Sequence, residues 1–233
     1  MMNINIHREM LKQVADALGP ELSKKVAFVG GCTTGLMLTD DFTKEQVRHT
    51  DDVDLIVHVL SYPSYLTLKQ ELKKRGFKEV MEHDDPICAM RLGELRVDFM
   101  PDKEDILNFG NRWYQLAWET ATDYPLTKET TIRLVKPVYF VATKLQAYLG
   151  RGNNDPLASR DIEDLLNIFD GRKEIIAEIL ESNHELVQFI AEQISGLLVN
   201  ASFAYAVQSA SLNDSAREEL IYKRLEQIAK AAE

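Results

Sequence analysis

The chain has 233 residues, 45% of them hydrophobic and 27% charged, which is enough for one large domain or two small ones with a buried core. Its formal net charge of −10 argues against sequence-independent binding of nucleic acid, which depends on Lys and Arg at phosphates. Its two cysteines form neither a disulfide framework nor a metal-ligand spacing, and residues 1–10 lack the apolar core of a signal peptide. We therefore expect a cytoplasmic protein with no membrane span.

The first part of the chain has a mixed pattern of helices and strands. Apolar residues at helical spacing predict helices over residues 5–18 and 65–75, which end at Gly19-Pro20 and Gly76. Residues 32–38 are typical of the first turns of a helix, and residues 39–50 of a polar loop. Short apolar or β-branched runs predict strands at 26–29, 53–59, 77–81, 87–92, 95–100, 114–122 and 131–135.

From Pro137 onward the spacing is helical almost throughout, with breaks at Asp155-Pro156 and Asp170-Gly171. The predicted fold class is α+β: a small mixed β-sheet domain with flanking helices over residues 1–136, followed by an all-helical domain over residues 137–233.

Two carboxylates stand one residue apart in a run that otherwise has the character of a buried strand, Thr50-Asp51-Asp52-Val53-Asp54-Leu55. Successive side chains of a strand point to opposite faces, so Asp52 and Asp54 share one face. Asp is depleted in strands, and like charges in a half-buried position repel. A cation is needed there, and paired carboxylates are suitable ligands for Mg²⁺.

Asp98 adds a third carboxylate inside an apolar strand pattern, Leu95-Arg96-Val97-Asp98-Phe99-Met100. If this strand lies beside the first, three carboxylates meet and can hold two metal ions; taken singly, Asp98 is equally a solvent-facing residue near a strand end. Gly30-Gly31, followed by Cys32-Thr33-Thr34, comes after a strand and opens a predicted helix, which favours a phosphate contact or, more simply, a tight turn.

The order of these motifs resembles the DNA polymerase β-like nucleotidyltransferase superfamily. The run Arg48-His49-Thr50-Asp51-Asp52-Val53-Asp54-Leu55 is similar to the Arg-x-Thr-x-Asp-x-Asp-Leu run of the AbiEii/AbiGii toxin-type nucleotidyltransferases. A second block, Lys144-Leu145-Gln146-Ala147 with Arg151 and the run from Arg160 to Leu165, is similar to their helical Lys-x-x-Ala, Arg and Lys/Arg-Asp-x-x-Asp motif. The resemblance spans residues 26–165; Cys32 departs from it, because a small or hydroxyl residue is usual there.

The resemblance implies a nucleotidyltransferase domain with Mg²⁺ or Mn²⁺ as cofactor and an NTP as co-substrate. Asp52, Asp54 and Asp98 would be the catalytic residues and metal ligands. The nucleotide-binding residues would be Gly30, Gly31, Thr33, Arg48, Thr50, Lys144, Arg151 and Asp161. Lys144 would reach the triphosphate, and Asp161 would orient Lys144 or Arg151 or take part in catalysis.

Simpler interpretations stand beside these roles. Lys144 and Arg151 lie on one helix face and can equally form a solvated basic edge paired with Asp161 or Asp164. Arg48 is equally a surface-loop arginine. Trp113, Tyr114 and Trp118 are expected to pack in the core rather than stack on a base.

We therefore expect a metal-dependent nucleotidyltransferase that moves an NMP to a hydroxyl acceptor and releases pyrophosphate. The acceptor can be tRNA, a protein or a small molecule, and the resemblance adds a toxin-like enzyme with a cognate antitoxin as partner. The alternatives are an antibiotic-type small-molecule adenylyltransferase, which the acidic net charge favours, and a non-catalytic nucleotide-binding module of the same fold.

Overall fold

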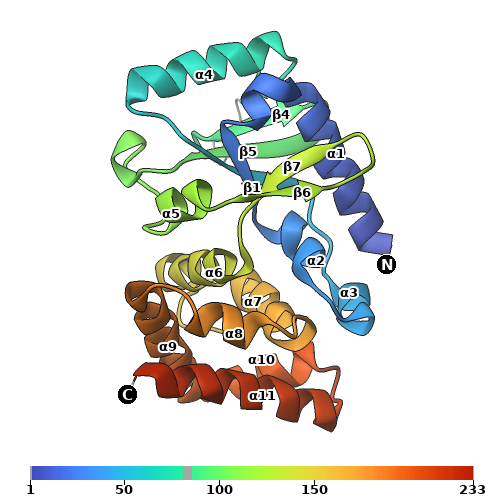
Figure 1. Ribbon diagram of the computed structural model, residues 1–233, viewed down its shortest axis with the longest axis vertical. Helices are drawn as coiled ribbons and strands as arrows, with labels where there is room; N and C mark the ends of the chain where they lie inside the picture. Colours follow the sequence, from blue (N-terminus) through green and yellow to red (C-terminus); the bar gives the residue numbers. More distant parts are fainter. Residues whose placement is uncertain (1, 81–85, 233) are drawn as a thin grey trace. The chain divides into compact units, whose positions relative to one another are not determined.

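The computed structural model of the protein describes residues 2–80 and 86–232, so the expected strand end at Met81 lies outside the described residues. The chain is an α+β protein with a seven-stranded mixed sheet and many helices (Figure 1). It divides into two compact units: Met1–Thr33 with Arg48–Lys136, and Thr34–Val47 with Pro137–Glu233. Residues 34–47, assigned to the N-terminal domain from the sequence, therefore pack with the C-terminal helices.

The sheet belongs to the first unit and has the strand order β3-β4-β5-β2-β1-β7-β6. Strand β2 runs parallel to β5 and antiparallel to β1, and β1 runs parallel to β7. The strands are β1 (Val26–Val29), β2 (Asp52–Val57), β3 (Lys78–Glu79), β4 (Ala89–Leu92), β5 (Leu95–Pro101), β6 (Thr122–Pro125) and β7 (Thr131–Leu134).

Three helices, α1 (Met2–Ser23), α4 (Tyr62–Lys74) and α5 (Tyr114–Glu119), surround this sheet (Figure 1). Helix α1 buries one stripe at helical spacing and is broken at Gly19, where φ is 64°. Helix α4 is fixed to the sheet by Tyr65, whose hydroxyl donates to the Phe99 carbonyl at 3.0 Å. The Tyr65 hydrogen bond links α4 to the central strand β5.

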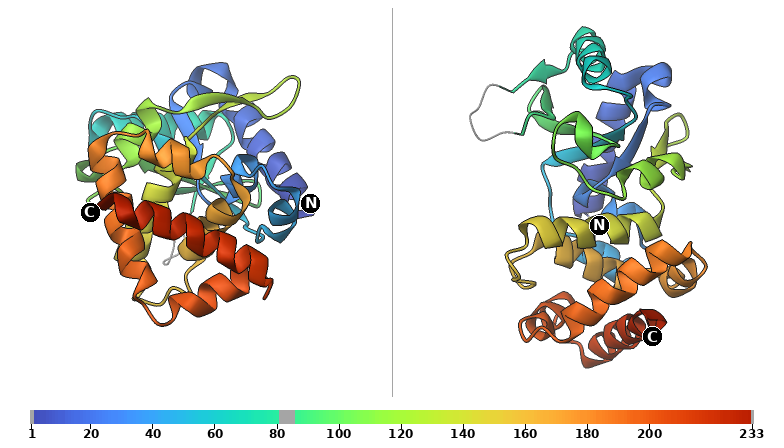
Figure 2. Two further views of the ribbon diagram at one scale, coloured as in Figure 1. Left: turned by 60° about the horizontal axis from the view of Figure 1, so that its bottom comes forward. Right: turned by 90° about the vertical axis from the view of Figure 1, so that its left-hand side faces the viewer.

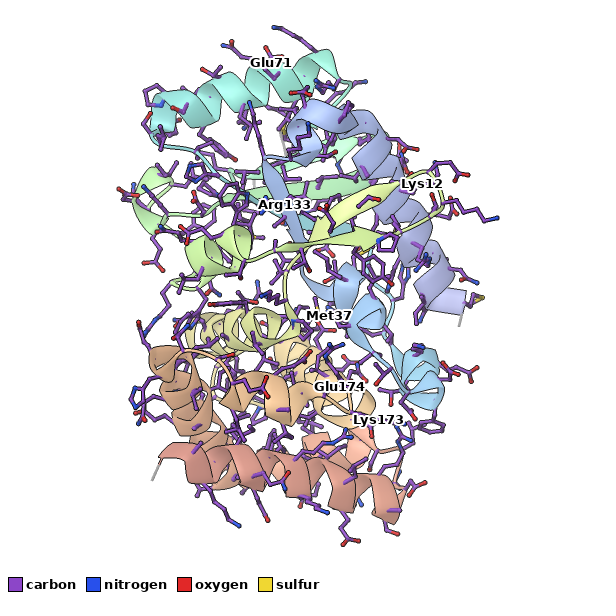
Figure 3. The ribbon with its side chains drawn as sticks, viewed as in Figure 1. Lys12, Met37, Glu71, Arg133, Lys173 and Glu174 are labelled. Atoms are coloured by element: carbon purple, nitrogen blue, oxygen red, sulfur yellow. The ribbon has the colours of Figure 1, made fainter. Side chains whose placement is uncertain are left out.

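The expected strand over residues 114–122 is wrong. The chain forms α5 there and enters β6 only at Thr122. Trp113 and Ala117 are both buried, and their separation of four residues is the period of one helix face. The expectation that Trp113 packs in the core is confirmed. Trp118 is half-buried, with its ring between His58, at 4.6 Å, and the Arg133 guanidinium, at 4.8 Å (Arg133 is labelled in Figure 3).

The second unit, as far as the structure describes it, is built of helices. They are α2 (Thr34–Met37), α3 (Asp41–Gln46), α6 (Pro137–Arg151), α7 (Arg160–Gly171), α8 (Ile175–Leu180), α9 (His184–Leu198), α10 (Phe203–Ala210), α11 (Ser215–Ala229) and the short η3 (Lys230–Ala232). Helix α7 is buried along nearly its whole length and contacts α6, α10 and α11. The long helices α9 and α11 lie side by side (Figure 2).

Residues 39–50 are not a loop throughout, because α3 forms within them. Asp40 caps α3 by accepting the Thr43 backbone N–H at 2.9 Å. The backbone N–H groups of Thr39 and Asp40 both donate to the Gly171 carbonyl, at 2.8 and 2.9 Å. Met37, labelled in Figure 3, accepts from Arg172 through its carbonyl at 2.7 Å. These hydrogen bonds attach the segment to the end of α7.

Within residues 2–80 and 86–232, no single helix is long and apolar enough to cross a membrane, and the pair α9 and α10, which meets the length and composition test together, is bent by 99°.

Candidate active site

The two aspartate strands are neighbours, as the metal-site hypothesis requires. Strand β2 pairs in parallel with β5, and the register sets Asp54 opposite Asp98. Register partners point to the same face of a sheet, and residues two apart on one strand do so as well. Asp52, Asp54 and Asp98 therefore share one face, and neighbouring strands lie about 4.8 Å apart. We call these three residues the acidic row.

The diglycine turn lies directly against the acidic row. Gly30 follows β1 with φ of +82°, a conformation that glycine adopts without strain. A Cβ atom on Gly30 would lie 1.8 Å from Asp54 Oδ2 and 2.6 Å from Asp54 Cγ. The missing side chain therefore makes the space that the Asp54 carboxylate occupies.

The segment that leads into β2 holds Asp52 in place. The Thr50 hydroxyl donates to Asp52 Oδ1, and the Thr50 backbone N–H donates to His7 Nε2 on α1 at 3.2 Å. Thr50 is buried, so its first role is to orient Asp52. Arg48 is half-buried, and its guanidinium donates to the His49 carbonyl at 3.3 Å.

The predicted phosphate turn differs from a helix N-terminus. After Gly30 the chain forms a 3₁₀ turn, η1 (Gly31–Thr33), and then only the four residues of α2, so the helix dipole is small. The Thr33 hydroxyl is buried and donates to the Gly30 carbonyl at 2.8 Å. The Thr33 backbone N–H donates to the same carbonyl at 3.0 Å, so Thr33 closes the turn.

Two buried thiols flank the acidic row. Burial raises the pKa of Cys32 well above its usual range, and the charges of Asp54 and Asp52 add to the rise. Burial and the charges of Asp98 and Asp54 raise the pKa of Cys88 to about 12. Both groups stay protonated at neutral pH, so Cys32 adds no negative charge beside the turn.

Arg96, which sequence analysis assigned no role, is the ion-pair partner of Asp98. Its Nε lies 3.0 Å from Asp98 Oδ1 and its Nη2 lies 2.8 Å from Asp98 Oδ2. Arg96 stands two residues before Asp98 on β5 and is the register partner of Asp52. The signal was present in the sequence, because a strand places residues 96 and 98 on one face.

The side chains of the acidic row are of the kind that binds a divalent cation, but their arrangement matches a metal site only in part. Carboxylate oxygens are the ligands that Mg²⁺ prefers, and Gly30 leaves room for Asp54. Yet among the described residues no three His, Cys, Asp or Glu side chains converge as a metal-ligand set. Both oxygens of Asp98 are instead engaged by the Arg96 guanidinium.

The second unit contains the predicted residues Lys144, Arg151 and Asp161 in one ion-pair cluster, in which Lys144 and Asp161 are buried and Arg151 is exposed. Lys144 Nζ lies 2.6 Å from Asp164 Oδ2 and 3.2 Å from Asp161 Oδ1. Arg151 binds Asp161 through Nε and Nη2, at 2.8 and 2.9 Å. The pairing that the sequence left open is therefore present, and Asp161 orients both cations. Thr34, which follows the glycine turn, donates its hydroxyl to Asp164 Oδ1 at 3.3 Å and so belongs to this cluster.

The cations of this cluster lower the pKa of Asp161. Burial acts to raise this pKa, but the hydrogen bond from Arg151 and the charge of Lys144 outweigh burial and lower it. Asp161 is therefore ionised at neutral pH although it is buried. The sequence indicated the ion pairs as one alternative, but not the burial of Lys144, Asp161 and Asp164, because that burial depends on how α6 and α7 pack.

Comparison with known proteins gives a likeness of fold alone. No protein-family model and no curated protein sequence matches the chain. Among solved structures, the chain is similar to JHP933 from Helicobacter pylori, with a TM-score of 0.50 and 11% sequence identity. The match covers 98% of this chain and 91% of that one.

Proposed function

We propose that the protein is a metal-dependent nucleotidyltransferase of the DNA polymerase β-like superfamily, nearest to the AbiEii/AbiGii toxin-type branch. The observation that carries the proposal is the register of Asp54 with Asp98, beside a glycine turn that makes room for the Asp54 carboxylate. The motif resemblance between residues 26 and 165 supports it.

Asp52, Asp54 and Asp98 would hold Mg²⁺ or Mn²⁺. When bound, the cation would neutralise charge on the triphosphate, as in phosphoryl transfer generally. Thr50 would keep Asp52 oriented through its hydroxyl. The backbone N–H groups of the Gly30-Gly31 turn would bind phosphate oxygens.

The reaction would join the acceptor oxygen to the α-phosphorus of an NTP. The bond from that phosphorus to the pyrophosphate oxygen breaks, and pyrophosphate leaves. Asp98 would accept the proton of the acceptor hydroxyl once its own oxygens are released from Arg96. The protein's contribution is positioning and charge compensation.

The resemblance also assigns Lys144, Arg151 and Asp161 to the nucleotide. We propose that Asp161 holds Lys144 and Arg151 as fixed cations for the triphosphate, as its contacts with both would allow. This role is tested separately, by the effect of Arg151→Gln on the Kd for an NTP. Arg151 suits this test because its side chain is 72% exposed.

The acceptor class follows from a second experiment. The net charge of −10 disfavours a polyanion and favours a cationic small molecule. Purified protein would be incubated with each α-³²P-labelled NTP, Mg²⁺ and, in turn, total RNA, cell protein and aminoglycosides. Asp52→Asn and Asp54→Asn should each lower the transfer rate by about a hundredfold or more. Unchanged transfer in either folded variant would refute the assigned roles.

One observation favours a second function, a non-catalytic nucleotide-binding module. Arg96 already neutralises Asp98, and an inert protein has no need to release it. Such a module would bind an NTP without transferring label to any acceptor.

A further inference from the structure

Arg96 is in the position that a cation of the active site would need. Its guanidinium forms two parallel hydrogen bonds with the carboxylate of Asp98, at 3.0 and 2.8 Å. This fork geometry is the strongest form of a charge-assisted pair. The Asp98 side chain is 10% exposed and that of Arg96 33% exposed, so the pair is shielded from water mainly on the carboxylate side.

A guanidinium and a divalent metal ion compete for such a carboxylate. Both need the lone pairs of the same two oxygens. Arginine does not lose its proton in proteins, so its charge cannot be removed in place. The side chain itself has to move, and its one-third exposure gives it a path toward solvent.

We propose that Arg96 is an internal counter-cation of the acidic row that must leave Asp98 before Asp98 can ligate a divalent metal ion. This inference rests on the proposed function. It makes Arg96 a positioning residue: Asp52 and Asp54 would hold the metal ion, and Asp98 would be available to it only after Arg96 has moved away. The metal affinity of the row is therefore lower than three carboxylates alone would give.

The test is a titration of the full chain with Mn²⁺ in the absence of nucleotide. Electron paramagnetic resonance measures the concentration of free Mn²⁺ at each point, which gives the Kd. Arg96→Gln should tighten binding by about tenfold, since a charge-assisted pair no longer opposes it. Arg96→Lys keeps the positive charge but cannot form the two parallel hydrogen bonds of a guanidinium. Its Mn²⁺ affinity should therefore lie between those of the wild type and Arg96→Gln. Lys78→Gln is the matched control, because Lys78 is exposed on β3 in the same row of the sheet as Arg96. It should change the affinity by less than about twofold.

A melting experiment supplies a second measurement, in which the effect of Mg²⁺ on the melting temperature separates the proposed role from a purely structural one. Without metal, Arg96→Gln should melt at a lower temperature than the wild type, because Asp98 loses its partner. Addition of Mg²⁺ should raise the melting temperature of Arg96→Gln more than that of the wild type. A loss of stability that Mg²⁺ does not reverse would overturn the inference.

The outcomes separate this inference from the function on which it rests. Suppose that Asp52→Asn abolishes Mn²⁺ binding while Arg96→Gln leaves the affinity unchanged or weaker. The claim that Arg96 competes with the metal ion for Asp98 would then be wrong, but metal binding by the acidic row would be supported. If Mn²⁺ binds equally well to Asp52→Asn, the metal lies elsewhere and the proposed function fails. If neither the wild type nor Arg96→Gln binds Mn²⁺, both are wrong.

Discussion

Replacement of Gly30 by alanine tests directly whether the missing side chain at Gly30 makes room for the Asp54 carboxylate. Gly30 has φ of +82°, and a left-handed conformation costs an L-residue about 1–2 kcal/mol. The new Cβ would also lie 1.8 Å from Asp54 Oδ2, so the carboxylate or the turn must shift. Forced overpacking of this kind costs about 1–3 kcal/mol. The expected loss of stability for Gly30→Ala is the sum, about 2–5 kcal/mol.

Gly93→Ala is the matched control. Gly93 has φ of +62°, with no other atom within 4 Å of its ideal Cβ position, so it carries the backbone cost alone, about 1–2 kcal/mol. Urea denaturation gives both free energies of unfolding, and Mn²⁺ binding reports the position of Asp54. Gly30→Ala should lose metal affinity, whereas Gly93→Ala should keep it. Equal stability losses and equal metal affinity in the two variants would refute the claim that Gly30 makes room for Asp54.

Three further predictions concern charge and burial. Lys144→Met should cost about 3–5 kcal/mol in urea denaturation because it leaves the buried Asp164 without its cation and Asp161 with Arg151 alone, while Arg151→Ala should cost less than about 1 kcal/mol; equal costs would contradict the cluster. The Thr43 backbone hydrogen bond, with Arg217, lowers the pKa of Asp40 to about 2, below the unfolded value of about 4. Asp40 therefore contributes stability above about pH 4 that is lost as the pH falls toward 2, and Asp40→Ala should flatten that part of the stability curve. Cys32 and Cys88 should react slowly with iodoacetamide at pH 8 in the folded protein, since their pKa values are raised; rapid labelling of both would show that they are not buried as described.

The acidic row was accessible from the sequence because it depends on local rules. Alternation along a strand places Asp52 and Asp54 on one face, and the apolar surroundings of Asp98 mark a second strand. The same rule puts Arg96 beside Asp98, but a positive charge next to a supposed metal ligand fits no metal-binding pattern. Its role became visible only in the hydrogen-bond geometry.

Other features depend on contacts between distant parts of the chain. The run 39–50 is polar, and α3 was missed although Asp40 is an N-cap residue of the preferred kind. Residues 34–47 are attached to α7 by the hydrogen bonds to Gly171 and to α11 by Arg217, which contacts Asp40 and Asp170 from far along the sequence. The strand predicted over 114–122 followed aromatic composition, while the helical spacing of Trp113 and Ala117 decided the structure.

The central claim is that the acidic row binds a nucleotide through a divalent metal ion. Calorimetric titration of each NTP into wild-type protein and into Asp54→Asn, with Mg²⁺ and with EDTA, tests it most directly. The account predicts saturable binding of at least one NTP to the wild type that EDTA abolishes and that Asp54→Asn loses. Binding with the same Kd in EDTA, or in folded Asp54→Asn, would contradict it.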